Sequence, residues 1–226
     1  MRWLLWKDFR HNGPIVTAGL LLLLAPYLVV LGLLFWPGIA SRPDWREGMF
    51  GASMYSLVLS QLTVALIGGN AMAGERVDRS AEFQAALPIT RKKILASKLL
   101  LALIVVAVVW LFNGPVMYFC LREKLPIDFR RPEELVEFVT NLALTGLLFF
   151  GVAWFLSSFL TSPTLAVAGG LVTPLLFLLT LYFVSELLRI VPPVHDVELP
   201  YRIFCLSLAP LGFAFGTYYY LRRVEP

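Results

Sequence analysis

The chain has 226 residues, of which 58% are hydrophobic and only 15% are charged, and its mean hydropathy is +0.76. A soluble core of this size cannot bury so large an apolar fraction, so the composition excludes a soluble globular protein and predicts an integral membrane protein. The net charge of +4 does not indicate nucleic-acid binding, because the basic residues flank apolar runs, where attraction to anionic lipid headgroups is their ordinary role.

The first segment, residues 1–13, is polar and aromatic. Trp3, Trp6 and Phe9 recur at near-helical spacing with basic residues between them, and Asn-Gly-Pro at 12–14 is a helix stop signal. We expect a short amphipathic helix on the cytoplasmic leaflet, with its aromatic rings at headgroup depth. The alternative is that these residues form only the basic, aromatic flank of the first membrane span.

Six long apolar runs follow, each close to the roughly 20 residues that cross about 30 Å of hydrocarbon as a helix. The runs are continuous rather than alternating, which favours helices over a β-barrel. The sequence therefore predicts an all-α integral membrane protein, with residues 1–226 forming a single transmembrane domain. The expected spans are Ile15–Trp36, Met49–Ala73, Leu99–Leu121, Val139–Leu156, Thr164–Val184 and Ile203–Leu221.

Residues 74–98 form a dense charged segment between the second and third runs. Six of its residues are basic, and all of them lie close to the ends of two spans: Arg76, Arg79, Arg91, Lys92, Lys93 and Lys98. Short basic loops face the cytoplasm, and an even number of spans places both termini on one side. We therefore expect a multi-pass protein of a prokaryotic plasma membrane, with both termini and this segment in the cytoplasm.

The same segment carries the pattern of a short helix. Asp78 or Ser80 can cap it, Phe83 and Leu87 share a face at i and i+4, and Pro88 ends it. An amphipathic helix with flanking charges suits insertion into a groove on another protein. The alternative is a solvated loop that only orients the chain in the membrane.

The order of these features resembles the permease subunits of type-2 ABC exporters. It comprises an amphipathic N-terminal helix, six spans, Gly-Glu-Arg at 74–76, Glu-Phe at 82–83, Leu-Pro at 87–88 and Thr-Arg at 90–91. In that family the loop after the second span is a coupling helix seated on the ATP-binding subunit. Gln84 and Ala85 stand where the family commonly has a Leu pair, and Arg79-Ser80 replaces a frequent Gly-Thr. The resemblance places the docking role on Glu75, Arg76, Glu82, Phe83, Leu87, Pro88 and Arg91.

The resemblance also implies partners. They are ABC ATPase subunits, which hold ATP and Mg²⁺, and a second permease that is a copy or a paralogue of this chain; no cofactor or metal is expected on the chain itself. The implied cargo is hydrophobic or amphiphilic and is exported. In residues 186–200 the resemblance implies short helices that close an outer gate, and a plain loop is the alternative there.

Sequence motifs that would support other functions are missing. There is no G-x-x-x-x-G-K-[ST] loop for ATP phosphates, so we expect no ATP hydrolysis by this chain alone. The runs hold no Asp, Glu, Lys or Arg at their centres, which disfavours coupling to an ion gradient, and no catalytic constellation indicates an enzyme. The remaining alternative is a membrane scaffold or assembly subunit that transports nothing; a neighbouring ATPase gene would favour the permease.

Mildly polar residues and glycine pairs lie within the runs. We expect the polar residues to hydrogen-bond between helices, and the Gly68-Gly69 and Gly169-Gly170 pairs to allow close packing. A substrate path lined by some of the polar residues is the alternative. They are Gln61, Thr63, Asn70, Asn113, Asn141 and Thr145.

Overall fold

The computed structural model describes residues 2–35, 44–78, 89–121, 132–187 and 198–222, and within these ranges it contains seven α-helices and no strand. Six of the helices are long and apolar enough to cross a membrane, so the predicted all-α membrane fold is confirmed. The helices are α1 (Arg2–His11), α2 (Gly13–Phe35), α3 (Trp45–Val77), α5 (Arg91–Leu121), α6 (Pro132–Phe159), α7 (Pro163–Leu187) and α8 (Glu198–Arg222).

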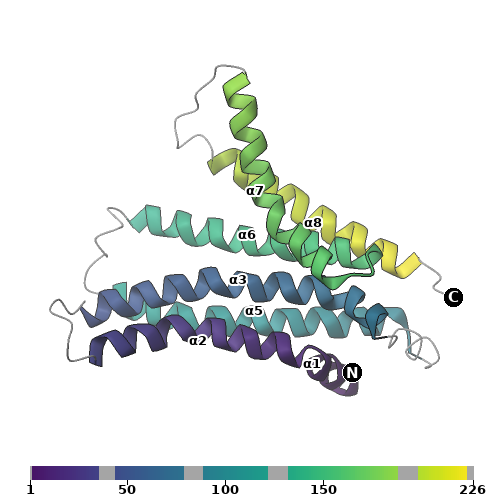
Figure 1. Ribbon diagram of the computed structural model, residues 1–226, viewed down its shortest axis with the longest axis horizontal. Coiled ribbons are helices and arrows are strands. Elements are labelled where there is room, and N and C mark those ends of the chain that lie inside the picture. The colour runs from purple at the N-terminus through teal and green to yellow at the C-terminus, as the bar shows by residue number, and fades with distance from the viewer. Residues whose placement is uncertain (1, 36–43, 79–88, 122–131, 188–197, 223–226) are drawn as a thin grey trace.

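Helix α3 is the centre of the bundle. It packs against α2, α5, α6 and α7, whereas α8 packs mainly on α6. Figure 1 shows α2, α3 and α5 running side by side, α6 beyond them, and α7 leaving the bundle at a steep angle. The helix that carries the charged segment at its end therefore touches most of the other spans.

Several helices extend beyond their predicted apolar runs. Helix α3 covers residues 45–77 instead of 49–73, and α6 begins at Pro132 instead of Val139. Polar residues at these ends continue the helix outside the hydrocarbon, because no breaker interrupts it there. Proline at the first position also suits a helix start, since its missing N–H has no intrahelical partner there; both α6 and α7 begin this way.

Small residues bring the helices into close contact. A Cβ at Gly69 of α3 would lie 2.4 Å from Cγ2 of Val167 on α7, and a Cβ at Gly151 of α6 would lie 2.4 Å from the carbonyl oxygen of Ala209 on α8. Helices in lipid gain little from hydrophobic burial against one another, so close van der Waals packing of this kind holds them together.

The polar residues inside the spans have two kinds of environment. Four bond to another part of the bundle: Asn113 accepts from the Tyr27 hydroxyl at 2.7 Å, and Asn70, Asn141 and Thr145 also make contacts outside their own helices. Gln61 instead donates to the carbonyl of Leu57 in its own helix, and the buried Thr63 hydroxyl has no hydrogen-bond partner among the described residues. The prediction of interhelical bonding is confirmed for the first four residues only.

One end of the bundle gathers segments that are far apart in sequence. Helix α1, the end of α3, the start of α5, the α6–α7 turn and the end of α8 all lie there (Figure 1). We call this region the terminal end.

Candidate functional site

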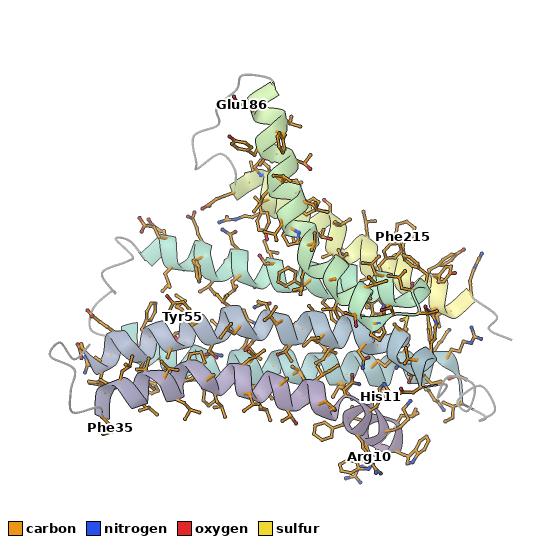
Figure 2. All side chains as sticks on the ribbon, in the orientation of Figure 1. Arg10, His11, Phe35, Tyr55, Glu186 and Phe215 are labelled. Atoms are coloured by element: carbon orange, nitrogen blue, oxygen red, sulfur yellow. The ribbon has the colours of Figure 1, made fainter. Side chains whose placement is uncertain are left out.

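Helix α1 lies at the terminal end and exposes an aromatic face. Trp3, Trp6 and Phe9 are 54%, 63% and 44% exposed, and the rings of Trp6 and Phe9 stack with centroids 6.1 Å apart. Figure 2 shows Arg10 pointing away from the bundle on the same helix. The expected N-terminal helix is therefore present, with the aromatic and basic face that insertion among lipid headgroups requires.

The opposite face of α1 is bound to the end of α3. Lys7 Nζ lies 2.8 Å from Glu75 Oε1, and His11 Nδ1 lies 3.2 Å from Asp78 Oδ2. Just after α1, Asn12 Oδ1 accepts a hydrogen bond from Asn70 Nδ2 at 2.9 Å. Since residues four apart share one side of a helix, Lys7 and His11 hold a single face of α1.

Four charged residues form a buried cluster between α1, α3 and α5. Lys98 Nζ of α5 approaches the same Glu75 Oε1 at 2.8 Å, and Lys7 Nζ also lies 3.3 Å from Asp8 Oδ1. The side chains of Asp8, Glu75 and Lys98 are at most 5% exposed, and that of Lys7 is 24% exposed. Two carboxylates thus face two ammonium groups, which offsets the large cost of removing each charge from water.

Lys98 and Asp8, the outer members of the cluster, differ in their further hydrogen bonds. Lys98 also donates to the carbonyl oxygen of Ala71 on α3. Neither carboxylate oxygen of Asp8 accepts a hydrogen bond within the described residues, so the nearby Lys7 ammonium is what offsets its buried charge. Removing Lys7 would therefore leave Asp8 as a buried charge without compensation.

Two arginines of the charged segment bind the ends of other helices. Arg76 donates to the carbonyl oxygens of Ser157 at 3.3 Å, Leu160 at 2.9 Å and Ser158, at the C-terminal end of α6. Arg91 donates to the carbonyl oxygen of Tyr220, near the end of α8, at 3.3 Å. The last carbonyls of a helix lack intrahelical partners and carry the negative end of its dipole. A guanidinium therefore stabilises a helix end by donating hydrogen bonds to these carbonyls and by its positive charge.

The sequence-predicted docking residues divide into two groups. Glu75, Arg76 and Arg91 lie at the ends of α3 and α5, and each contacts another helix of the same chain. Glu82, Phe83, Leu87 and Pro88 lie outside the described residues. A docking role for either group stays a prediction.

The roles of Lys7, Asp8 and Lys98 in this cluster were not predicted from the sequence. One signal was available. Lys98 is followed directly by a long apolar run, and Glu75 comes two residues after the end of another, so each needed a counter-charge at the membrane boundary. Their pairing required α3 and α5 to lie side by side, which the sequence does not state.

A groove lies near the middle of the bundle. It has a volume of about 570 Å³ and is lined by apolar side chains of α3, α5, α6 and α8, with Gln61 as its main polar residue. Its size suits a small hydrophobic molecule or a lipid tail. Among the described residues, no group of three His, Cys, Asp or Glu is placed to hold a metal ion.

This architecture agrees with a match to a known protein family. The model described as ABC-2 family transporter protein matches residues 46–210, well over half of the chain. The chain belongs to the ABC-2 transporter family. Comparisons with curated proteins and with solved structures give no match. This ABC-2 protein is thus a multi-pass permease of an ABC transporter, a family of membrane components that work with ABC ATPase subunits.

Proposed function

We propose that this ABC-2 permease is one membrane-spanning half of an exporter whose ATP is hydrolysed by a separate subunit. A second permease, a copy or a paralogue, completes the membrane part. The observation that carries the proposal is the construction of the terminal end. There the segment between α3 and α5 emerges from two helix ends that are tied to α1, α6 and α8.

The docking surface in this proposal is the segment between α3 and α5, residues 78–90. In the sequence pattern, Phe83 and Leu87 are spaced to form an apolar ridge, with Glu82 and Pro88 adjacent to them along the chain. Glu75, Arg76 and Arg91 stand where this segment joins the bundle. Because they contact other helices, a displacement of the segment is passed on to α1, α6 and α8.

The expected cargo is hydrophobic or amphiphilic. The paired charges Glu75 and Lys98 lie near helix ends, and the groove near the middle of the bundle is almost entirely apolar. A hydrophilic solute would lose its hydration there without gaining hydrogen-bond partners. A lipid-like molecule that enters from the bilayer would not suffer this loss of hydration.

The docking role of Phe83 can be tested directly. Phe83→Asp would place an unpaired charge against an apolar groove of the ATPase, so we expect loss of co-purification with the ATPase subunit and loss of stimulated ATP hydrolysis. Membrane insertion of the permease should be unchanged, since the residue lies outside the apolar runs. Trp45→Asp is the matched control: it is 57% exposed at the opposite end of the bundle and should leave the complex intact.

This experiment also separates the permease from the scaffold or assembly subunit. A scaffold would bind the ATPase without changing its turnover, whereas a permease stimulates hydrolysis. A complex that survives Phe83→Asp with normal ATP turnover would contradict docking through this ridge.

A further inference from the structure

We propose that a second groove, between α2 and α5, binds one acyl chain of an anionic phospholipid from the leaflet at the terminal end. This groove is separate from the larger one beside α6 and α8, since Val109 is the one lining residue that the two share. The inference goes beyond the proposed function, because it concerns a lipid held by the permease alone. It therefore stands or fails independently of any ATPase or cargo.

The groove exists because two helices share a neighbour but hardly meet. In the described part of the chain, α2 and α5 both pack on α3 and have almost no direct backbone contact with each other. The buried residues Gly19, Leu23 and Leu101 form its floor, and its volume is about 140 Å³. An apolar cavity of about 150 Å³ holds one benzene molecule, so this groove can hold a chain segment of about six carbon atoms.

The edges of the groove face lipid. Leu20 on α2 and Ile104 and Val108 on α5 line it, and each is more than two-fifths exposed. All three lie in helices that are apolar enough to cross the membrane, where an exposed side chain meets hydrocarbon. An acyl chain can therefore enter the groove directly from the bilayer.

The two ends of the groove fix the direction of the chain. Just beyond Leu23, the Tyr27 hydroxyl donates to Asn113 at 2.7 Å and joins α2 to α5. The other end is lined by Phe9 of α1, a helix that lies across the bundle axis at the terminal end (Figure 1). On α5 the groove extends from Leu101 to Val109, about 12 Å, which is close to the roughly 15 Å of hydrocarbon in one leaflet. A lipid of that leaflet can thus place its chain in the groove and its headgroup beside α1.

The headgroup end of the groove is basic. Arg10 directly follows Phe9 on α1, and Lys93 lies three turns before Ile104 on the same side of α5. Both side chains are exposed, and neither has an acidic partner among the described residues. Basic residues beside a gap between spanning helices favour an anionic headgroup, so charge selects the lipid whose chain the groove holds.

The lipid site is tested on the permease alone by photolabelling in phosphatidylcholine nanodiscs. Phosphatidylglycerol and phosphatidylcholine probes with a diazirine in one chain are compared, and mass spectrometry maps the labelled peptides. Residues 16–23 and 101–109 should be labelled at least about fivefold more by the phosphatidylglycerol probe, because one basic residue near the surface contributes about 1 kcal/mol. The exposed Leu175 and Leu179 of α7 should be labelled equally by both probes. Equal labelling of the groove by both probes would overturn the anionic site.

Two pairs of variants separate the groove from general lipid contact. Val105→Trp fills the half-buried wall of the groove and should reduce its labelling at least about fivefold, whereas Leu111→Trp, 74% exposed beyond the closed end, should not. Lys93→Gln should lower the preference for phosphatidylglycerol, whereas Lys92→Gln, an exposed neighbour on the opposite side of α5, should leave it unchanged. The lysine pair decides the question even if Val105→Trp does not fold. Equal effects within either pair of folded variants would contradict the site.

Other occupants give different results. A diazirine fatty acid that labels the groove as strongly as phosphatidylglycerol would show that no phospholipid headgroup is recognised. A second copy of the chain on this face would join two Leu20→Cys side chains in a disulfide, with Cys120 and Cys205 replaced by alanine. Either result would overturn the inference.

Discussion

At the scale of single residues, burial separates side chains that look alike in the sequence. Asn113 is fully buried and bonds to the Tyr27 hydroxyl, which ties α2 to α5. Thr63 is almost as deeply buried but makes no such bond among the described residues, and its side chain fills the space beside Gly19 instead. Composition predicted polar contacts in general, whereas the partner of each residue depends on which helix faces it.

The Tyr27–Asn113 bond gives a first prediction at this scale. Tyr27→Phe removes the donor and leaves a carbonyl of Asn113 unpaired in an apolar interior, which should cost about 1 kcal/mol of unfolding free energy. Unfolding in a mixed detergent titration measures it. Tyr55→Phe, at a position that is 69% exposed, is the control and should change stability far less. Equal effects of the two changes would contradict a structural role for the buried bond.

At the scale of elements, the contact between α6 and α8 depends on the absence of a side chain. Gly151 lies against the backbone of Ala209, and Gly212 faces Gly151 from the other helix. A backbone cannot move aside as the end of a flexible side chain can, so any larger residue must push the helices apart. Periodicity and hydropathy do not reveal which glycines have this role.

A pair of identical substitutions tests this contact. Gly151→Ala places a Cβ 2.4 Å from the Ala209 carbonyl oxygen, and we expect a destabilisation of about 1–3 kcal/mol from overpacking. Gly114→Ala, in open space on α5, should be neutral or stabilising by up to about 1 kcal/mol, because alanine favours helix. Thermal unfolding in detergent compares the two variants, and a larger destabilisation by Gly114→Ala than by Gly151→Ala would contradict a close backbone contact between α6 and α8.

At the scale of the whole molecule, the terminal end brings together segments that are far apart in the sequence. Both helix ends that flank the docking segment, the amphipathic α1 and the ends of α6 and α8 meet there (Figure 1). The ends of α3 and α5 are tied there to three other helices, α1, α6 and α8, through a few contacts of charged side chains.

The orientation of this end in the membrane is a prediction for the whole molecule. A cysteine introduced at Lys92, near the start of α5, should react with an impermeant thiol reagent only in inside-out vesicles, because the surrounding basic residues favour the cytoplasm. A cysteine at Trp45, at the other end of α3, should show the opposite pattern. Labelling of position 92 from the cell exterior would reverse the proposed topology.

The sequence by itself determined the class of protein, the number of spans and the presence of the N-terminal helix. These follow from the length and periodicity of apolar runs. Such runs are local properties of the sequence, and the thickness of the bilayer sets the length that a spanning helix needs. It also singled out Glu75, Arg76 and Arg91, through their place in the charged segment. The tertiary structure alone decided what these residues contact, because Glu75 meets Lys7 and Lys98 only after three helices pack together. Partner choice for a buried charge is a long-range property: it depends on which helix ends come within hydrogen-bonding distance, and no local pattern contains that distance.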